Sequence, residues 1–252
     1  MTVQNITFRA VTYTIRQLAR LVCRVDDSQV NRIPMQGPLI LLVNHINFLD
    51  APVVFTHVQP RQITALVKQE TWDNPAMGFL FTLWKGIPIR RGEADHKAFR
   101  MAREALKRGN LLAVAPEGTR SGTGQLQPGH AGAALLAIQS NAPVQPVVYY
   151  GSESFWQNLP RFKRTDFKIV VGNPFRVDTH GLRSSKELTQ EIITEIMYQM
   201  AAILPPQYRG SYSDLSQASE KYLVFEPGVE SNLAVARKKE NAKEENFLTG
   251  EA

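Results

Sequence analysis

The sequence has little cysteine, and Cys23 is the only thiol among 252 residues. A single thiol cannot close a disulfide within the chain, and such a chain suits a reducing compartment. Cys23 stands among arginines and apart from every polar cluster that could support catalysis, which argues against a cysteine nucleophile. A chain of this length can bury a stable core without disulfides.

Long apolar runs are also missing. The longest, such as residues 39–43, have the length of a strand, whereas a membrane-spanning helix needs about 18 apolar residues. Four arginines interrupt the apolar residues near the N-terminus, at positions 9, 16, 20 and 24. We therefore predict neither a transmembrane helix nor a signal peptide.

No acidic residue precedes Asp26. On a helix, residues 8–25 place one group of apolar side chains on one face and the four arginines opposite. The apolar group consists of Val11, Ile15, Leu18, Val22 and Val25. This pattern is typical of a basic amphipathic helix that lies in a membrane interface. The alternative is a surface helix that packs on the domain and exposes its arginines to solvent.

The charge balance of the whole chain is basic, with a net charge of +6 and a pI of about 9.5. Such a balance favours a polyanionic partner and leaves open whether it is nucleic acid, an anionic lipid or a phosphorylated substrate. The shares of hydrophobic residues (43%) and charged residues (21%) are ordinary for a globular protein and favour a folded domain.

From residue 39 onward, short apolar runs alternate with helical patterns. This alternation predicts an α/β domain with a largely parallel central sheet flanked by helices. The predicted strands are residues 39–43, 63–67, 87–89, 111–115, 144–149 and 167–171. The predicted helices are residues 51–58, 75–84, 95–108, 130–140 and 185–203.

Composition divides the chain into three predicted parts. Residues 1–27 form the N-terminal amphipathic helix, residues 28–210 the main domain, and residues 211–252 a partly disordered C-terminal extension. From about residue 228 the extension becomes charged and loses its periodicity. That composition is typical of a flexible tail, either disordered or loosely helical.

Polar clusters follow directly after three of the predicted strands. They occupy residues 44–50, 90–92 and 116–121. In open α/β sheets, ligands bind outside the carboxyl ends of the strands. The three clusters therefore converge on one site if these strands are parallel neighbours.

His45 and Asp50 are the candidate catalytic pair. On a continuous helix, residues five apart lie roughly 140° from each other, so the two meet only if His45 lies in a turn and Asp50 in the next helix's first turn. Pro52 supports that start, because the first turn tolerates proline. A carboxylate on one ring nitrogen leaves the other free to take a proton from an attacking hydroxyl. The alternative is that Asp50 merely caps the helix.

The other two clusters carry features of an anion site. In the stretch PEGTRS, Gly118 permits close backbone approach, Thr119 adds a hydroxyl and Arg120 offers a planar fork to a phosphate. The adjacent residues Arg90 and Arg91 repel each other, and an anionic ligand is a natural reason for such a pair. Taken alone, each cluster is also explained by solvated surface side chains.

In combination, these motifs resemble the lysophosphatidic acid acyltransferase family (1-acylglycerol-3-phosphate acyltransferases) of the glycerolipid acyltransferase superfamily. Residues 44–50 match its N-H-x4-D motif, and residues 86–92 match its G-x-I-P-V-x-R-G type motif, with Arg91 as the motif arginine. Residues 116–121 match P-E-G-T-R-S, and residues 142–147 resemble V-P-V-x-P-V. Four motifs in the family's order make the resemblance specific over residues 30–175.

The resemblance implies an enzyme that moves a fatty acyl group from a thioester donor, acyl-CoA or acyl carrier protein, to a hydroxyl of a lysophosphatidic acid-type acceptor in phospholipid biosynthesis. It implies His45 and Asp50 as the catalytic pair. The implied substrate-binding residues are Arg91, Glu117, Gly118, Thr119 and Arg120. The expected partners are the two substrates and a membrane bilayer, with the protein peripheral or monotopic on the cytoplasmic side.

Two positions depart from the family pattern. Gln127 stands where a basic residue is common, and His130 replaces a residue that is usually small, which leaves the acceptor's head group open. The histidines show no metal-ligand spacing, and so we expect no metal site and no cofactor apart from the acyl donor. The aromatic residues Phe79, Phe81 and Trp84 either line an acyl tunnel or belong to the core.

Two other functions compete with this interpretation. A basic nucleic-acid-binding protein would suit the pI, but the sequence has no basic patch interleaved with aromatic residues and no known binding motif, and so we expect no nucleic-acid partner. A non-catalytic membrane-bound protein of the same fold would have no need of an intact pair of His45 and Asp50.

Overall fold

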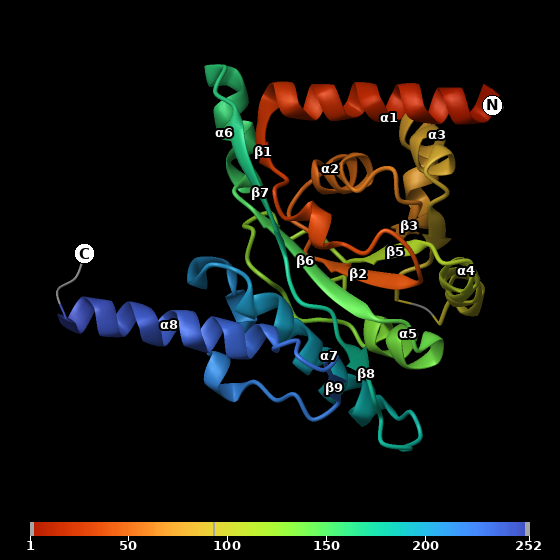
Figure 1. Cartoon of the computed structure of the whole chain (residues 1–252). Helices are drawn as coiled ribbons and strands as arrows, with labels where there is room; N and C mark the ends of the chain where they lie inside the picture. Colours follow the sequence, from red (N-terminus) through yellow and green to blue (C-terminus); the bar gives the residue numbers. More distant parts are fainter. Residues whose placement is uncertain (1–2, 93, 250–252) are drawn as a thin grey trace.

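The computed structural model describes residues 3–92 and 94–249. Its centre is a seven-stranded sheet with the strand order β1-β7-β6-β2-β5-β3-β4 (Figure 1). The strands are β1 (Cys23–Asp26), β2 (Leu39–Val43), β3 (Ile63–Lys68), β4 (Ile87–Ile89), β5 (Leu111–Val114), β6 (Val144–Tyr150) and β7 (Thr165–Val171).

The sheet is largely parallel, as the alternation of strands and helices predicts. Five of its neighbouring strand pairs are parallel and the β6–β7 pair is antiparallel. All five residues of the central strand β2 are buried, because helices cover both faces of a sheet of this kind. The predicted strands differ from the observed ones by at most two residues at an end.

Helices lie on both faces of the sheet (Figure 1). Along β2, Leu39 and Leu41 pack with α1, α2 and α3, whereas Ile40 and Leu42 pack with α4, α5 and α7. The alternation follows from the two-residue period of a strand. The bounds are α1 (Val3–Val22), α2 (Asp50–His57), α3 (Pro75–Leu83), α4 (His96–Lys107), α5 (Gly132–Ser140) and α7 (Lys186–Ala202).

The N-terminal helix α1 packs on the domain. Thr12 and Ala19 are buried on its inner side, and Ile15 and Val22 pack against the same core. Trp84 Nε1 donates a hydrogen bond to Thr12 Oγ1 over 3.3 Å. Part of the apolar face that the sequence predicts to contact a membrane is therefore buried against the protein's own core. This agrees with the alternative interpretation, a surface helix that packs on the domain.

The helix also ends earlier than the sequence pattern predicts. Val25, expected on the apolar helical face, lies in β1, which pairs with β7. The segment forms an edge strand because β7 offers backbone groups with which it can pair. This pairing joins residues far apart in sequence, and so helical periodicity cannot predict it. On the outer side of α1, Ile6, Tyr13, Leu18 and Leu21 remain exposed.

Most arginines of the N-terminal segment are held by acids of the protein. Arg16 and Arg20 both reach Asp27 Oδ2, over 3.2 and 2.6 Å. Arg24 Nε lies 2.6 Å from Asp166 Oδ1. The helical-wheel pattern suggests that these three arginines face solvent or lipid, but in the structure each of them binds an acid of the protein.

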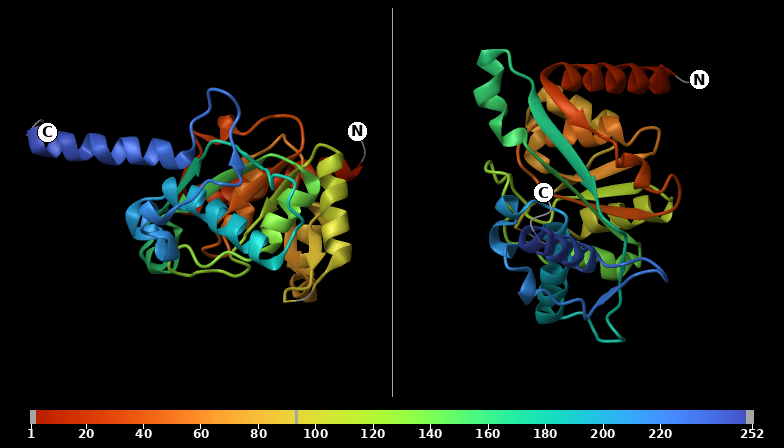
Figure 2. Two further views of the ribbon diagram at one scale, coloured as in Figure 1. Left: turned by 90° about the horizontal axis from the view of Figure 1, so that it is seen from below. Right: turned by 60° about the vertical axis from the view of Figure 1, so that its left-hand side comes forward.

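The C-terminal part of the chain packs on α7. Tyr212, Leu215, Tyr222 and Leu223, all in the predicted extension, are buried in the core on that face. Strands β8 (Arg176–Val177) and β9 (Leu223–Val224) form a small antiparallel sheet. Helix α8 (Asn232–Thr249) starts against this core and then extends away from the domain (Figure 2). Residues 250–252 of the predicted tail lie outside the described residues.

A short projection stands between β6 and β7. It consists of α6 (Phe155–Asn158), the 3-10 helix η4 (Leu159–Arg161) and Phe162, the residue that caps the end of η4. Figure 1 and the right view of Figure 2 place it beside the C-terminal end of α1. Within residues 3–92 and 94–249, no helix is both long enough and apolar enough to cross a membrane.

Candidate active site

His45 and Asp50 meet at the carboxyl end of β2. His45 lies in the loop after the strand, Asp50 is the first residue of α2, and His45 Nδ1 lies 2.7 Å from Asp50 Oδ2. The same oxygen accepts hydrogen bonds from the backbone N–H groups of Ile46 and Asn47, over 2.7 and 2.9 Å. The Asp50 side chain is only 3% exposed. The carboxylate therefore organises the loop and orients the imidazole.

The structure does not support the alternative that Asp50 caps the start of α2. Leu49 is the N-cap of α2, and no side chain caps that end of the helix. The Asp50 side chain points back toward the loop, where Asn47 Oδ1 accepts from the backbone N–H of Leu49 over 2.9 Å. Within the described chain, His45 Nε2 makes no hydrogen bond, and the ring is about one-fifth exposed. This nitrogen is therefore open to a substrate.

Asn44 attaches the loop to the neighbouring strand β6. Its Nδ2 donates to the carbonyl oxygen of Tyr149 over 2.9 Å, and its Oδ1 accepts from the N–H of Tyr149 over 2.8 Å. Just past the end of β2, the Asn44 side chain thus makes the two hydrogen bonds to β6 that backbone groups would make if the strand continued. Farther along the loop, Asn47 Nδ2 donates to the carbonyl oxygen of Ser152 over 2.8 Å. The residues around His45 are therefore held by backbone groups on both sides.

Glu117 supports His45 from the loop that follows the neighbouring strand β5. Its Oε1 accepts from the backbone N–H of His45 over 2.8 Å, and its Oε2 accepts from the N–H of Gln127 over 3.0 Å. The residue is only 2% exposed. Burial raises the pKa of Glu117 to about 7, although the two N–H donors oppose the shift; the charge of Asp50 adds to it. Both carboxylate oxygens of Glu117 thus accept backbone N–H groups, one of them from His45.

Two further backbone hydrogen bonds join the PEGTRS loop to the His45 loop. Ser121 donates its N–H to the carbonyl oxygen of His45 over 2.8 Å, and Gly122 donates to that of Ile46 over 3.1 Å. The clusters after β2 and β5 thus converge, as expected for parallel neighbouring strands.

Gly118 is required by the geometry of this loop. Its φ is +67°, and a Cβ placed there would lie 2.8 Å from His130 Cδ2. Both the backbone conformation and the close ring exclude a side chain. His130, which sequence analysis identifies only as a departure from the family pattern, therefore lies directly beside the PEGTRS loop.

The two arginines predicted to bind phosphate lie close together. Burial lowers the pKa of Arg91, Glu70 opposes this shift, and the nearby charge of Arg120 adds to it. Arg120 and Thr119 are exposed, and within the described chain neither side chain forms a hydrogen bond or ion pair. Two cations held near each other by their loops favour an anionic ligand.

The other residue of the arginine pair has a structural partner. The backbone N–H of Arg90 donates to Asp95 Oδ2 over 3.0 Å, and its Nε lies 3.7 Å from the same oxygen. Asp95 also caps α4 by accepting from the N–H of Ala98 over 3.0 Å. Arg90 thus contributes to the start of α4, and Arg91 is the residue of the pair that lies near Arg120.

A largely apolar cavity of about 1140 Å³ lies between α1, α3 and the start of β3. Phe79 and Trp84 line it, but His45 and Asp50 do not. It lies at the amino end of β3, whereas His45 follows the carboxyl end of the parallel strand β2. Phe81 and Trp84 are buried and pack with Phe55, so the core interpretation holds for these two residues.

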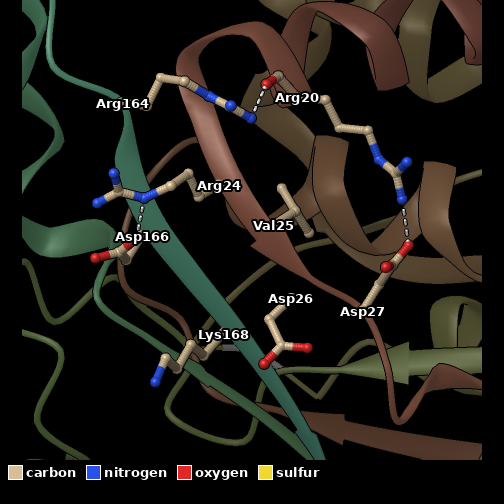
Figure 3. A pocket seen from close by; sticks show the side chains of 8 residues that line it. All are labelled: Arg20, Arg24, Val25, Asp26, Asp27, Arg164, Asp166 and Lys168. Carbon is tan, nitrogen blue, oxygen red and sulfur yellow. Dashed lines mark hydrogen bonds and ion pairs between the residues drawn. The ribbon is translucent and has the colours of Figure 1, made fainter.

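A polar pocket of about 460 Å³ lies where the end of α1 meets β1 and β7 (Figure 3). Four of its charged side chains form ion pairs within the protein, Arg20 with Asp27 and Arg24 with Asp166. This pocket is also separate from His45.

Comparison with known proteins identifies the family. A family model described as Acyltransferase matches residues 24–150, a range that contains all four motifs. The chain belongs to this acyltransferase family. The acyltransferase is thus an enzyme of the class that its motifs predict, and the resemblance noted in the sequence is confirmed.

Individual relatives agree with this assignment. The acyltransferase is 26% identical over 211 residues to the 1-acyl-sn-glycerol-3-phosphate acyltransferase of Pseudomonas aeruginosa, which covers 80% of this chain and 79% of the relative. It is 31% identical over 165 residues to the 1-acyl-sn-glycerol-3-phosphate acyltransferase beta of Homo sapiens, covering 64% of this chain and 59% of the relative.

A solved structure has the same fold. The crystal structure of the 1-acyl-sn-glycerophosphate (LPA) acyltransferase PlsC from Thermotoga maritima superposes on the acyltransferase with a TM-score of 0.56. The sequence identity is 24%, and the match covers 78% of this chain and 80% of that one. This likeness supports the α/β architecture described above.

Proposed function

We propose that the protein transfers a fatty acyl group from a thioester donor to the free hydroxyl of a lysophosphatidic acid-type acceptor in phospholipid biosynthesis. The observation that carries the proposal is the 2.7 Å contact of His45 Nδ1 with Asp50, which leaves Nε2 open. The neighbouring cations Arg91 and Arg120 fit an acceptor phosphate, and the names of the relatives point to the same acceptor.

In the proposed reaction, His45 Nε2 takes the proton of the acceptor hydroxyl as its oxygen attacks the thioester carbonyl. The new C–O bond forms, the C–S bond breaks, and the proton passes from His45 to the leaving sulfur. Asp50 stabilises the transient imidazolium through Nδ1. General base catalysis of this kind contributes about 10²–10⁴-fold, and the rest must come from orientation of the two substrates.

The acceptor phosphate is proposed to bind Arg91 and Arg120, with the Thr119 hydroxyl beside them and the Gly118 backbone allowing close approach. Glu117 holds the backbone of His45 and so fixes the base relative to the acceptor. The thioester activates the acyl carbon, and so the step needs neither a redox cofactor nor a metal. Acyl-CoA and acyl carrier protein share this thioester, and either is a suitable donor.

Because one substrate and the product are lipids, we propose that the enzyme works as a peripheral protein on the cytoplasmic face of a membrane. The outer side of α1 supports this, since Tyr13, Leu18 and Leu21 are exposed apolar side chains. Such side chains can insert at the boundary between head groups and acyl chains.

The test is an activity screen of the purified protein. Labelled acyl-CoA and acyl carrier protein are offered as donors against lysophosphatidic acid, glycerol 3-phosphate and other lysolipids. We expect transfer to lysophosphatidic acid, loss of transfer in His45→Ala, and full activity in His180→Asn. The control replaces an exposed histidine whose φ of +53° asparagine tolerates. More than a few per cent of activity in folded His45→Ala would contradict the role of His45.

A further inference from the structure

Three apolar side chains stand exposed on the projection formed by α6 and η4. Trp156 is 64% exposed, Leu159 is 43% exposed and Phe162 is 99% exposed. The exposed parts of these side chains add no hydrophobic stabilisation to the isolated domain. An exposed apolar cluster of this kind marks an interaction surface.

The backbone at the tip holds Phe162 outward. Its φ is +51°, and its N–H donates to the carbonyl oxygen of Leu159, while the N–H of Lys163 donates to that of Asn158. This is a helix-ending turn whose left-handed position favours glycine. A bulky phenylalanine there is unfavourable for the backbone, and packing within the domain does not offset this cost, since the side chain is almost fully exposed.

Hydrogen bonds of Arg164, which follows the projection in sequence, connect the projection to the end of α1. Arg164 donates to the backbone carbonyl oxygens of Arg20 and Cys23, over 2.6 and 2.7 Å. Leu18 and Leu21, both exposed, lie on this last part of α1. The two elements lie side by side in Figure 1 and in the right view of Figure 2, and so they can meet one surface together.

Positive charge surrounds the apolar tip. Residues 155–165 read FWQNLPRFKRT, with three cations and no acid. Arg161 and Lys163 are exposed and form no ion pair within the described chain. An apolar tip with a basic border is complementary to a bilayer with anionic head groups.

The same projection reaches the catalytic loop. The ring of Phe48, which lies between His45 and Asp50 in sequence, is 5.3 Å from the rings of both Phe155 and Trp156. Phe48 and Trp156 are themselves partly exposed. Apolar side chains thus continue from the base of the projection to the loop that carries His45.

We propose that the projection of α6 and η4, residues 155–162, inserts into the head-group and acyl boundary of an anionic bilayer beside the outer face of α1. Phe48 and Trp156 then offer an apolar path along which an acyl chain passes from the bilayer to His45. This proposal rests on the proposed function for its lipid substrate, but the insertion itself is measured without any reaction.

Vesicle sedimentation and tryptophan fluorescence test the insertion in the full chain. The wild type is expected to bind vesicles that contain phosphatidylglycerol more tightly than vesicles of phosphatidylcholine. Brominated phospholipids should quench its fluorescence. Trp156→Ser should remove most of this quenching, because Trp84 is buried in the core and Trp72 is partly buried in the 3-10 helix η2 (Gln69–Asp73), outside the projection.

Phe162→Gly is the decisive variant. Glycine suits the φ of +51°, so the variant is expected to melt no lower than the wild type while its vesicle affinity falls about tenfold, the effect of removing one buried aromatic ring. The control is Leu182→Ser, which replaces another exposed apolar residue outside the projection and should bind as the wild type does.

Activity separates this proposal from the proposed function. Phe162→Gly should lose about tenfold in transfer to acceptor embedded in vesicles and retain transfer to a short-chain acceptor dissolved as a monomer. A wild type that transfers no acyl group but binds vesicles through Phe162 would refute the proposed function alone. Equal vesicle binding by the wild type and Phe162→Gly would refute the insertion. A dimer in solution that Phe162→Gly dissociates would also refute it, because the surface would then join two copies of the chain.

Discussion

Glu117 accepts a hydrogen bond from the backbone N–H of His45 over 2.8 Å, so that the carboxylate of one motif binds the backbone of the histidine in another. Its second oxygen binds the N–H of Gln127, which lies in the segment that follows the PEGTRS loop. Burial raises the pKa of this carboxyl to about 7. The folded state therefore binds this proton more tightly than the unfolded chain does.

The raised pKa predicts how Glu117 affects stability. Its contribution is fully present below about pH 4.5 and is lost as the pH rises through about 7, from the unfolded to the folded pKa. The free energy of unfolding of the wild type relative to Glu117→Gln should therefore fall by roughly 3 kcal/mol over this range. Urea denaturation of both proteins at pH 4.5, 6 and 8 measures it. A difference that stays constant or grows with pH contradicts the assignment.

Asp50→Asn should lower kcat by about 10²–10⁴-fold and leave the substrate KM values nearly unchanged. The backbone donors Ile46 and Asn47 at Oδ2 favour an amide oxygen in that position. The ring of His45 therefore keeps its orientation but loses the charge that stabilises its cation. Steady-state kinetics, with circular dichroism as the check of folding, measure this. A folded variant that keeps a tenth of the activity would show that the charge is dispensable.

Arg91→Lys and Arg120→Lys should each raise the acceptor KM about tenfold, because lysine keeps the charge but loses the planar fork. The donor KM should change little. Arg183→Lys, at an exposed arginine outside the motifs, is the matched control. Kinetics with each substrate varied in turn decide the matter, and unchanged acceptor constants in both variants would remove these residues from the phosphate site.

Gly118→Ala should destabilise the protein by about 1–2 kcal/mol through its left-handed backbone alone, with a further cost from the ring of His130. Adding His130→Ala should recover the steric part of the loss and not the backbone part. Thermal melting of the single and double variants measures both parts. If the second substitution recovers nothing, the ring does not lie against Gly118.

Helix α1 should respond differently on its two sides. Ala19→Glu places a charge in the core and should cost more than 2 kcal/mol of unfolding free energy, a magnitude typical of a buried unpaired charge. Leu21→Ser, on the exposed side, should change that energy by less than about 0.5 kcal/mol and weaken binding to anionic vesicles. Equal stability of Ala19→Glu and the wild type would mean that α1 does not pack on the domain.

Local patterns of sequence were sufficient for most of the architecture. Five apolar residues before Asn44 form β2, and the helical period of residues 186–202 forms α7. The parallel arrangement followed from the alternation of strands and helices. Because ligand sites of such sheets lie at the carboxyl ends of strands, the convergence of the His45 and PEGTRS loops was also predictable.

Side-chain direction was not predictable in the same way. The sequence shows an acid at Glu117 but not that its two oxygens are taken by backbone donors from His45 and Gln127. Those donors are 72 and 10 residues away along the chain. Only the pairing of β2 with β5 brings the first of them within reach.

The sequence by itself determined the family, most of the strands and helices of the main domain, and His45 and Asp50 as the candidate pair, because these depend on short spacings and local periodicity. Tertiary structure decided which face of α1 is buried and where Phe162 points. Both depend on contacts between segments that are distant in sequence. Local patterns cannot distinguish the two outcomes, because burial against the core and exposure toward a membrane require the same residue types.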